Sequence, residues 1–176
     1  TLVSYLKRNA HYSEKGITFI AGADSEEFLS YKDLYQKALF CLYNLQNKGV
    51  AEGDEVVFQI EDNKAFMILF WACLLGKIIP VPLTVGNRND HKLKFIKVWN
   101  LLNNPYLVCE DEIFNALKSD TSVDTNNHAF SDQIDKKHIL VTDVLEEKEK
   151  GTECLSISED LAYIQFSSGS TGDPKG

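Results

Sequence analysis

The chain has 176 residues, of which 44% are hydrophobic, and its formal net charge is −8. This length is sufficient for one domain with a substantial core, whereas the negative charge, with lysines scattered among acids, argues against a nucleic-acid-binding surface. The longest apolar run, residues 65–76, is too short to cross a bilayer and no signal peptide opens the sequence, so we expect a cytoplasmic protein without a membrane span.

The first third of the chain predicts a helix, a hairpin and a second helix. Residues 2–9 present apolar side chains on one side, and residues 17–21 and 28–29 are typical of short strands joined by a glycine-containing turn. Ser30 then fits an N-cap, with Asp33 at the capping-box position of the second helix. The predicted buried face of this second helix comprises Leu34, Ala38, Cys41, Leu42 and Leu45.

Strands and helices alternate from residue 55 onward. The predicted strands are residues 55–60, 78–81, 106–109, 138–141 and 161–166. The predicted helices are residues 64–75, 89–102 and 112–117. The helix at 64–75 is apolar on nearly all sides, which predicts its burial between layers. Strands separated by helices indicate right-handed β-α-β crossovers and an α/β fold, with a mostly parallel sheet flanked by helices.

Two stretches are poor in apolar residues. Residues 118–137 are rich in Ser, Thr, Asp and Asn, which predicts a long exposed loop. Residues 146–158 begin with five consecutive charged side chains, and we expect a solvated linker there rather than a binding site. Three lysines lie close together in the predicted helix at 89–102, where a solvated face is expected beside apolar positions. These lysines are Lys92, Lys94 and Lys97, and the apolar positions are Leu93, Ile96 and Trp99.

Cysteine and histidine give no sign of a metal site. No two of the four cysteines have C-x-x-C spacing, and three of the four lie in apolar runs, so we expect reduced, mostly buried thiols. No histidine pairs with a nearby cysteine or carboxylate in a ligand-like pattern. These residues are Cys41, Cys73, Cys109, Cys154, His11, His91, His128 and His138.

The last ten residues carry the clearest functional signal. They follow the apolar stretch 161–166 and combine three glycines with four hydroxyl side chains and one lysine. Glycines allow an anion to approach the backbone closely, and successive backbone N–H groups can form a nest for phosphate oxygens. The hydroxyl groups and the lysine add further donors. The predicted site for a polyphosphate, with ATP preferred, comprises Ser167, Ser168, Gly169, Ser170, Thr171, Gly172 and Lys175.

Two other interpretations of this loop are weaker. An exposed turn has a similar composition, but it does not need so many small hydroxyl or glycine residues after an apolar strand. The loop is not a Walker A motif either, because Asp173 and Pro174 separate Gly172 from Lys175. Ligands of parallel α/β sheets bind outside the carboxyl ends of the strands, and this loop follows a predicted strand.

Residues 168–176, with the sequence SGSTGDPKG, resemble the phosphate-binding signature of the AMP-forming adenylating enzymes. This superfamily includes acyl-CoA synthetases, fatty acyl-AMP ligases, adenylation domains of nonribosomal peptide synthetases, and luciferases. Residues 29–34 and 74–83 resemble two upstream elements of the family in the expected order. The resemblance implies that residues 1–176 are the N-terminal part of an adenylation domain. The first residue is Thr rather than Met, which favours a chain cut from a longer polypeptide.

The resemblance also implies a chemistry with two half-reactions. A carboxylic acid attacks the α-phosphate of Mg²⁺-bound ATP to give an acyl-adenylate, and a thiol then attacks that adenylate. The partners implied are the acid and either a carrier protein with a phosphopantetheine arm or coenzyme A. Gln165, Phe166 and Asp173 are similar to the residues found in fatty acyl-AMP ligases and in polyketide or hybrid assembly lines. Amino-acid-activating domains are the alternative.

Most of the family's active site lies downstream of this signature. Its adenine, magnesium and acyl sites and its catalytic lysine all follow the loop. We therefore expect no catalytic residue and no metal ligand within residues 1–176, and no adenylation by this chain alone. A non-catalytic nucleotide-binding module or an interaction domain is the alternative from a different functional class.

Overall fold

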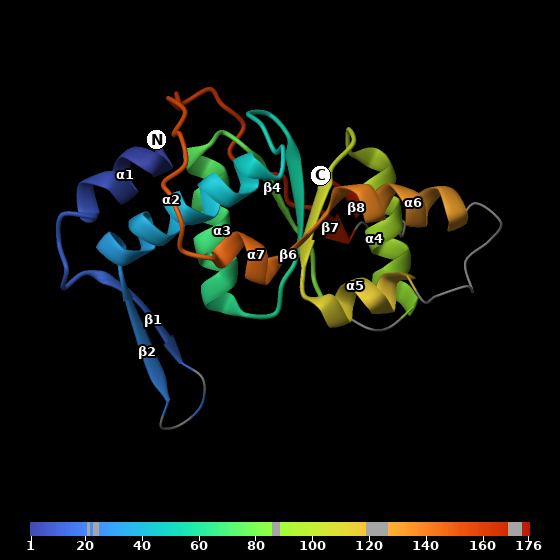
Figure 1. Cartoon of the computed structure of the whole chain (residues 1–176), viewed down its shortest axis with the longest axis horizontal. Coiled ribbons are helices and arrows are strands. Elements are labelled where there is room, and N and C mark those ends of the chain that lie inside the picture. The colour runs from blue at the N-terminus through green and yellow to red at the C-terminus, as the bar shows by residue number, and fades with distance from the viewer. Residues whose placement is uncertain (21, 23–24, 86–88, 119–126, 169–173) are drawn as a thin grey trace.

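The computed structural model describes residues 1–20, 22, 25–85, 89–118, 127–168 and 174–176 (Figure 1). Helices are written α and strands β. In chain order the elements are α1 Leu2–Asn9, β1 Gly16–Ile20, β2 Glu26–Ser30, α2 Tyr31–Asn47, β3 Glu55–Gln59, α3 Asn63–Leu75, β4 Ile79–Pro82, α4 Asn89–Leu101, β5 Tyr106–Cys109, α5 Asp111–Lys118, α6 Asn127–Lys137, β6 His138–Leu140, α7 Val141–Leu145, β7 Ser167–Ser168 and β8 Pro174–Lys175.

Four parallel strands form the central sheet in the order β4-β3-β5-β6. Val57 of β3 lies opposite Val81 of β4 and Leu107 of β5. The chain enters the sheet at β3, moves to β4 on one side and then crosses to β5 on the other, so the direction of strand order reverses at β3. The predicted α/β fold with a mostly parallel sheet flanked by helices is confirmed.

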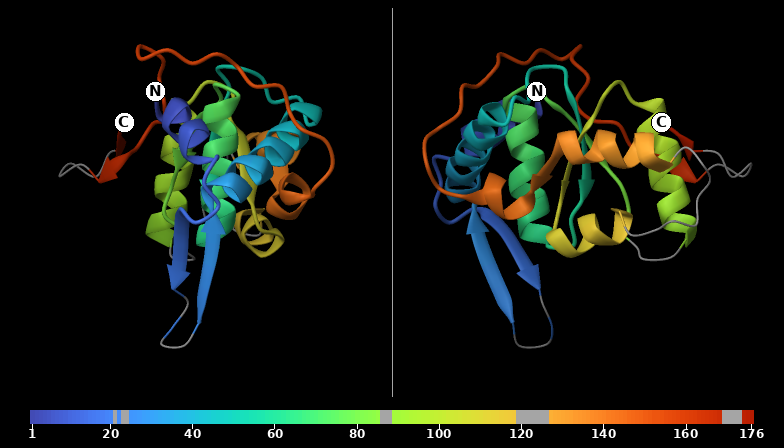
Figure 2. Two further views of the ribbon diagram at one scale, coloured as in Figure 1. Left: turned by 90° about the vertical axis from the view of Figure 1, so that its left-hand side faces the viewer. Right: turned by 45° about the vertical axis from the view of Figure 1, so that its right-hand side comes forward.

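The strands bury both faces because their side chains alternate between two cores. Val56 and Phe58 face a core that they share with α1, α2, α3 and α7. Val57 and Leu107 face a second core, to which α4 and α6 contribute. Helix α3 lies between the sheet and helix α2, which packs on it (Figure 2). This burial of α3 between layers is the one predicted from its apolar composition. The structure is thus built from three layers, helix, sheet and helix.

Local signals account for the helix starts. The Ser30 hydroxyl accepts the N–H of Asp33 at 3.0 Å and donates to its carboxylate at 2.7 Å, which confirms the predicted N-cap of α2. Asp62 caps α3 in the same way, accepting the N–H of Ala65. The predicted hairpin is β1 paired with β2, and it projects from the body of the structure (Figure 1).

The prediction of an exposed loop at residues 118–137 is wrong for the second half of this stretch, which forms helix α6. Ile134 of α6 is fully buried in the second core, which anchors the helix although the segment is rich in polar residues. The apolar face predicted for α4 is also shifted. Phe95 and Val98 are buried together with Trp99, whereas Leu93 is 45% exposed.

The strand predicted at 161–166 is wrong as a regular strand, although this segment runs along the edge of β4. The backbone N–H groups of Ile79 and Leu83 donate to carbonyls of Asp54 and Phe58, on the side of β4 where β3 lies. In a strand the backbone groups of alternate residues point to opposite sides, so the alternate positions between them direct their backbone groups to the outer edge of β4. Those positions are Pro80 and Pro82, which have no N–H. The outer edge of β4 therefore offers acceptors but no donors, and a continuous ladder cannot form there.

Candidate functional site

Residues 146–166, here called the strap, lead from α7 across α2 and α3 to the C-terminal loop (Figure 2). Gly151 N–H donates to the carbonyl of Leu39 in α2 at 2.8 Å. The side-chain amide of Gln46 donates to the carbonyl of Thr152 at 2.8 Å and accepts the N–H of Thr152 at 2.9 Å. The charged side chains at 146–150 are exposed, as predicted, but the backbone that follows them is fixed on α2.

Glu153 ties the strap to two helices. The Tyr35 hydroxyl donates to its carboxylate at 2.6 Å, and Lys7 of α1 forms an ion pair with it. Burial, together with the hydrogen bond to this carboxylate, raises the pKa of Tyr35 to about 12. The phenol therefore acts as a neutral donor that holds the strap at α2.

The strap runs parallel to β4 toward the carboxyl end of the sheet. Near the start of β4, Lys77 lies 2.8 Å from Glu52 and 3.2 Å from Asp160. A backbone hydrogen bond and the Lys77 ammonium lower the pKa of the Asp160 carboxyl. Four residues after Asp160, Ile164 N–H donates to Pro80 O at 3.1 Å. The loop that follows the strap thus leaves at the end of the sheet where ligands of this fold class bind.

The two arms of the loop pair as short antiparallel strands. In this pairing Ser167 lies opposite Lys175, and Ser168 lies opposite Pro174. The Ser167 hydroxyl is 3.4 Å from the carbonyl of Lys175, a long hydrogen bond. Both the Ser167 and Lys175 side chains are exposed. The other predicted site residues, Gly169, Ser170, Thr171 and Gly172, lie outside the described residues.

Phe166, which was not predicted as a site residue, lies between the sheet and the loop. Its ring packs with Leu83 and Ile164 on the second core. A Cβ added to Gly176 would lie 2.9 Å from the ring atom Cε1 and 3.0 Å from Cζ, so the ring lies against one side of this exposed glycine. The signal in the sequence was a large apolar residue directly before the hydroxyl-rich loop.

The thiols do not form a reactive site. Cys41, Cys73 and Cys109 are buried and Cys154 is partly exposed, which confirms the expectation of reduced and mostly buried cysteines. Burial raises the pKa of Cys41 and Cys73, and it raises the pKa of Cys109 to about 12. Neutral thiols are poor nucleophiles and poor metal ligands.

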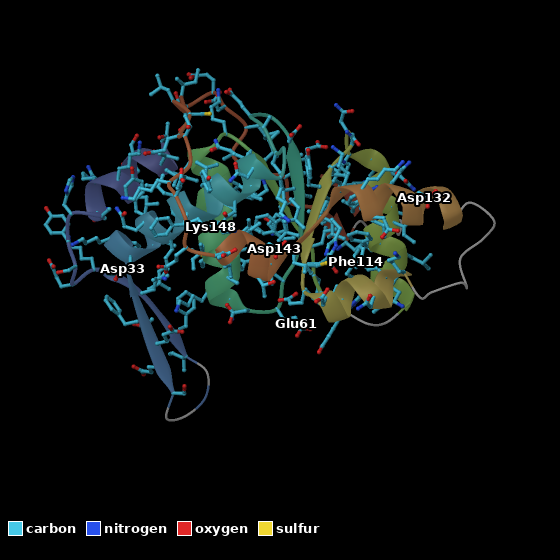
Figure 3. The ribbon with its side chains drawn as sticks, viewed as in Figure 1. Asp33, Glu61, Phe114, Asp132, Asp143 and Lys148 are labelled. Atoms are coloured by element: carbon cyan, nitrogen blue, oxygen red, sulfur yellow. The ribbon has the colours of Figure 1, made fainter. Side chains whose placement is uncertain are left out.

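Acidic side chains are spread over the molecule. Figure 3 shows Asp33, Glu61, Asp132 and Asp143 on four separate segments. Within the part of the chain that the structure describes, no group of three His, Cys, Asp or Glu side chains is arranged to hold a metal ion. None of the described helices has the length and apolar character needed to span a membrane.

Comparisons with known proteins agree with this geometry. The family model described as AMP-binding enzyme matches residues 6–176. The chain is 26% identical to the 4-hydroxybenzoate–CoA/benzoate–CoA ligase of Rhodopseudomonas palustris, covering 99% of this chain and 32% of that relative. It is also 26% identical to the D-alanine–D-alanyl carrier protein ligase of Bacillus licheniformis, with 99% and 31% covered.

The solved structure of McyG A-PCP complexed with phenylalanyl-adenylate superposes with a TM-score of 0.86 at 34% identity. The superposition covers 100% of this chain and 27% of the McyG A-PCP chain. The chain therefore spans less than a third of the length of these relatives.

Proposed function

The chain belongs to the AMP-binding enzyme family, and on that premise we propose that its C-terminal loop binds the β- and γ-phosphates of ATP during formation of an acyl-adenylate. The observation that carries this proposal is the pairing of Ser167 with Lys175 at the carboxyl end of the sheet. This pairing places one hydroxyl and one ammonium at the base of a glycine-rich loop. Ser168, Gly169, Ser170, Thr171 and Gly172 would line the remainder of the phosphate site.

The proposed reaction displaces pyrophosphate from ATP. An oxygen of the substrate carboxylate attacks the α-phosphorus, the bond to the β-phosphate oxygen breaks, and pyrophosphate leaves with the electron pair. Negative charge therefore grows on the leaving group in the transition state. Lys175 and the loop donors stabilise that charge best when they are already in place.

In the second half-reaction a thiolate attacks the acyl carbonyl of the adenylate, and AMP leaves with the electrons of the acyl–phosphate bond. We propose a carrier-protein phosphopantetheine thiol as the acceptor, in polyketide or nonribosomal peptide synthesis. The likeness to the D-alanyl carrier protein ligase and to the McyG A-PCP structure supports this choice. Coenzyme A is the alternative, supported by the likeness to the 4-hydroxybenzoate–CoA/benzoate–CoA ligase.

Magnesium would accompany ATP in this reaction, but the described residues supply no cluster of ligands for it. The contribution of this chain is therefore assigned to the loop and its supports alone. We propose that residues 1–176 do not adenylate an acid by themselves. The competing proposal, a nucleotide-binding module without catalysis, predicts ATP binding but no carboxylate-dependent exchange in any longer form of the protein.

Pyrophosphate exchange into ATP by the full-length protein tests the proposal, with fatty, aryl and amino acids as substrates. Because a charge-assisted contact contributes about 1.5–3 kcal/mol, Lys175→Ala should raise the KM for ATP or slow adenylation, lowering kcat/KM for ATP by about 10- to 100-fold. Lys148→Ala serves as the control, since Lys148 lies on the strap and pairs only with neighbouring Glu146 among the described residues. Unchanged kinetics in Lys175→Ala would refute the role of the loop. Carrier protein and coenzyme A are then compared as acceptors of the activated acid.

A further inference from the structure

Phe166 packs on the second core and lies against Gly176 at the base of the loop, and it contributes no polar side-chain atom to the site. We propose that it is a positioning residue: its ring, pressed against Gly176, sets where Ser167 and Lys175 stand relative to one another. This inference rests on the proposed phosphate-binding function. It adds a residue pair to it, Phe166 with Gly176, whose role is to place the donors rather than to touch the nucleotide.

The ring is held firmly from the side of the sheet. Phe166 and Ile164 pack on the second core with Leu83, the residue directly after β4. Ile164 is also joined to the sheet by the hydrogen bond from its N–H to Pro80 O at 3.1 Å. The first arm of the loop is therefore attached to the central sheet.

The second arm has much weaker support of its own. Among the described residues, its pairing with the first arm comprises Ser167 with Lys175 and Ser168 with Pro174. Isolated two-stranded pairs are marginally stable even when they are longer than this. Contact between β8 and α4 and contact between the Phe166 ring and Gly176 are what keep the second arm against the body.

Gly176 permits this contact because it has no side chain. An added Cβ would lie 2.9 and 3.0 Å from two ring atoms of Phe166 and 3.1 Å from Cγ2 of Ile164. All three distances are shorter than ordinary van der Waals contact, so an alanine must displace either the ring or the second arm. Because the ring packs on the second core, we expect the arm to move. Lys175, which directly precedes Gly176, moves with that arm.

A displaced arm should weaken binding of the triphosphate more than it slows the chemical step. Part of the binding free energy of the nucleotide is used to return the arm to its place, which weakens binding. Once the nucleotide is bound, the same donors contact the leaving pyrophosphate, so the chemical step is little changed. The expected signature is a higher KM for ATP with little change in kcat. A purely structural role would instead lower the melting temperature without shifting the KM.

The test is a double-mutant cycle in the full-length protein, read out as kcat and KM for ATP in pyrophosphate exchange. Gly176→Ala should raise the KM by about five- to tenfold and change kcat by less than about twofold, because the lost placement amounts to about one hydrogen bond. Phe166→Leu alone removes the ring and should raise the KM by a smaller factor. In the Phe166→Leu background the two shortest contacts are removed and only the 3.1 Å approach to Ile164 Cγ2 remains, so Gly176→Ala should raise the KM by less than about twofold.

Phe66→Leu is the matched control, because Phe66 is a partly buried aromatic residue packed on the other core, away from the loop. It should lower the melting temperature and leave the KM for ATP unchanged. A KM effect of Gly176→Ala that is equal in both backgrounds, or no effect at all, overturns the positioning role while the phosphate site stands. No effect of Lys175→Ala overturns the phosphate site, and this inference with it.

Discussion

At Gly151 the strap lies directly against the backbone of helix α2, and an alanine there should detach this part of the strap. A Cβ at this position would lie 2.5 Å from Tyr43 N, 2.7 Å from Leu42 Cγ and 2.8 Å from the Leu42 carbonyl carbon. Two of these atoms belong to the helix backbone and cannot rotate away. The added methyl group must therefore lift the strap from the helix.

The cost follows from the hydrogen bonds made at this place. Lifting the strap breaks the bond from Gly151 N–H to Leu39 O and the two bonds between Gln46 and the Thr152 backbone. At about 1 kcal/mol net for each hydrogen bond, Gly151→Ala should lower the free energy of unfolding by about 3 kcal/mol.

Urea denaturation followed by circular dichroism measures this difference. Thr152→Ala is the matched control, because it shortens the neighbouring, exposed side chain and leaves the backbone bonds in place. Its midpoint should stay close to that of the wild type. If Gly151→Ala were as stable as the control, the close approach of the strap to α2 would not exist in solution, and the reasoning would be refuted.

Three further predictions concern buried polar groups and thiols. Asn44→Leu should cost about 2–4 kcal/mol in urea denaturation, because two backbone carbonyls lose the amide that donates to them at 3.2 and 2.7 Å. The ring of His138 stacks on Phe114 with 3.6 Å between the ring centroids, and burial lowers the pKa of this histidine. Because the folded chain then binds the proton less readily than the unfolded chain does, the contribution of His138 to stability is complete above about pH 6.5 and is lost as the pH falls below that value. His138→Phe should flatten the pH dependence of the free energy of unfolding between pH 7.5 and 5.5, and an unchanged dependence would contradict this role. Cys154 should be the one thiol that Ellman's reagent modifies in the native chain, with the other three reacting only in denaturant; a second fast thiol would show that a buried cysteine is accessible.

The errors in the sequence-based predictions share a physical cause. Residues 161–166 have the composition of a strand, and nothing within them shows that the facing edge of β4 lacks N–H donors at Pro80 and Pro82. Helix α6 has the composition of a loop, and its formation depends on the burial of Ile134 by strands and helices distant in sequence. The sequence predicts Phe166 as the end of a strand and as a point of resemblance to fatty acyl-AMP ligases, but it does not predict the contact with Gly176, which exists only when the chain has turned back.

The sequence by itself determined the features whose causes are local. Caps such as Ser30 and Asp62, the apolar composition of α3 and the alternation of strands with helices fix an α/β fold, and the glycines and hydroxyls after residue 166 fix the kind of ligand expected. Only the tertiary structure decided that the strap is fastened to α2, that it runs parallel to β4, and that Ser167 meets Lys175. These features depend on which backbone groups of distant segments remain free to pair, and no local pattern of side chains records that.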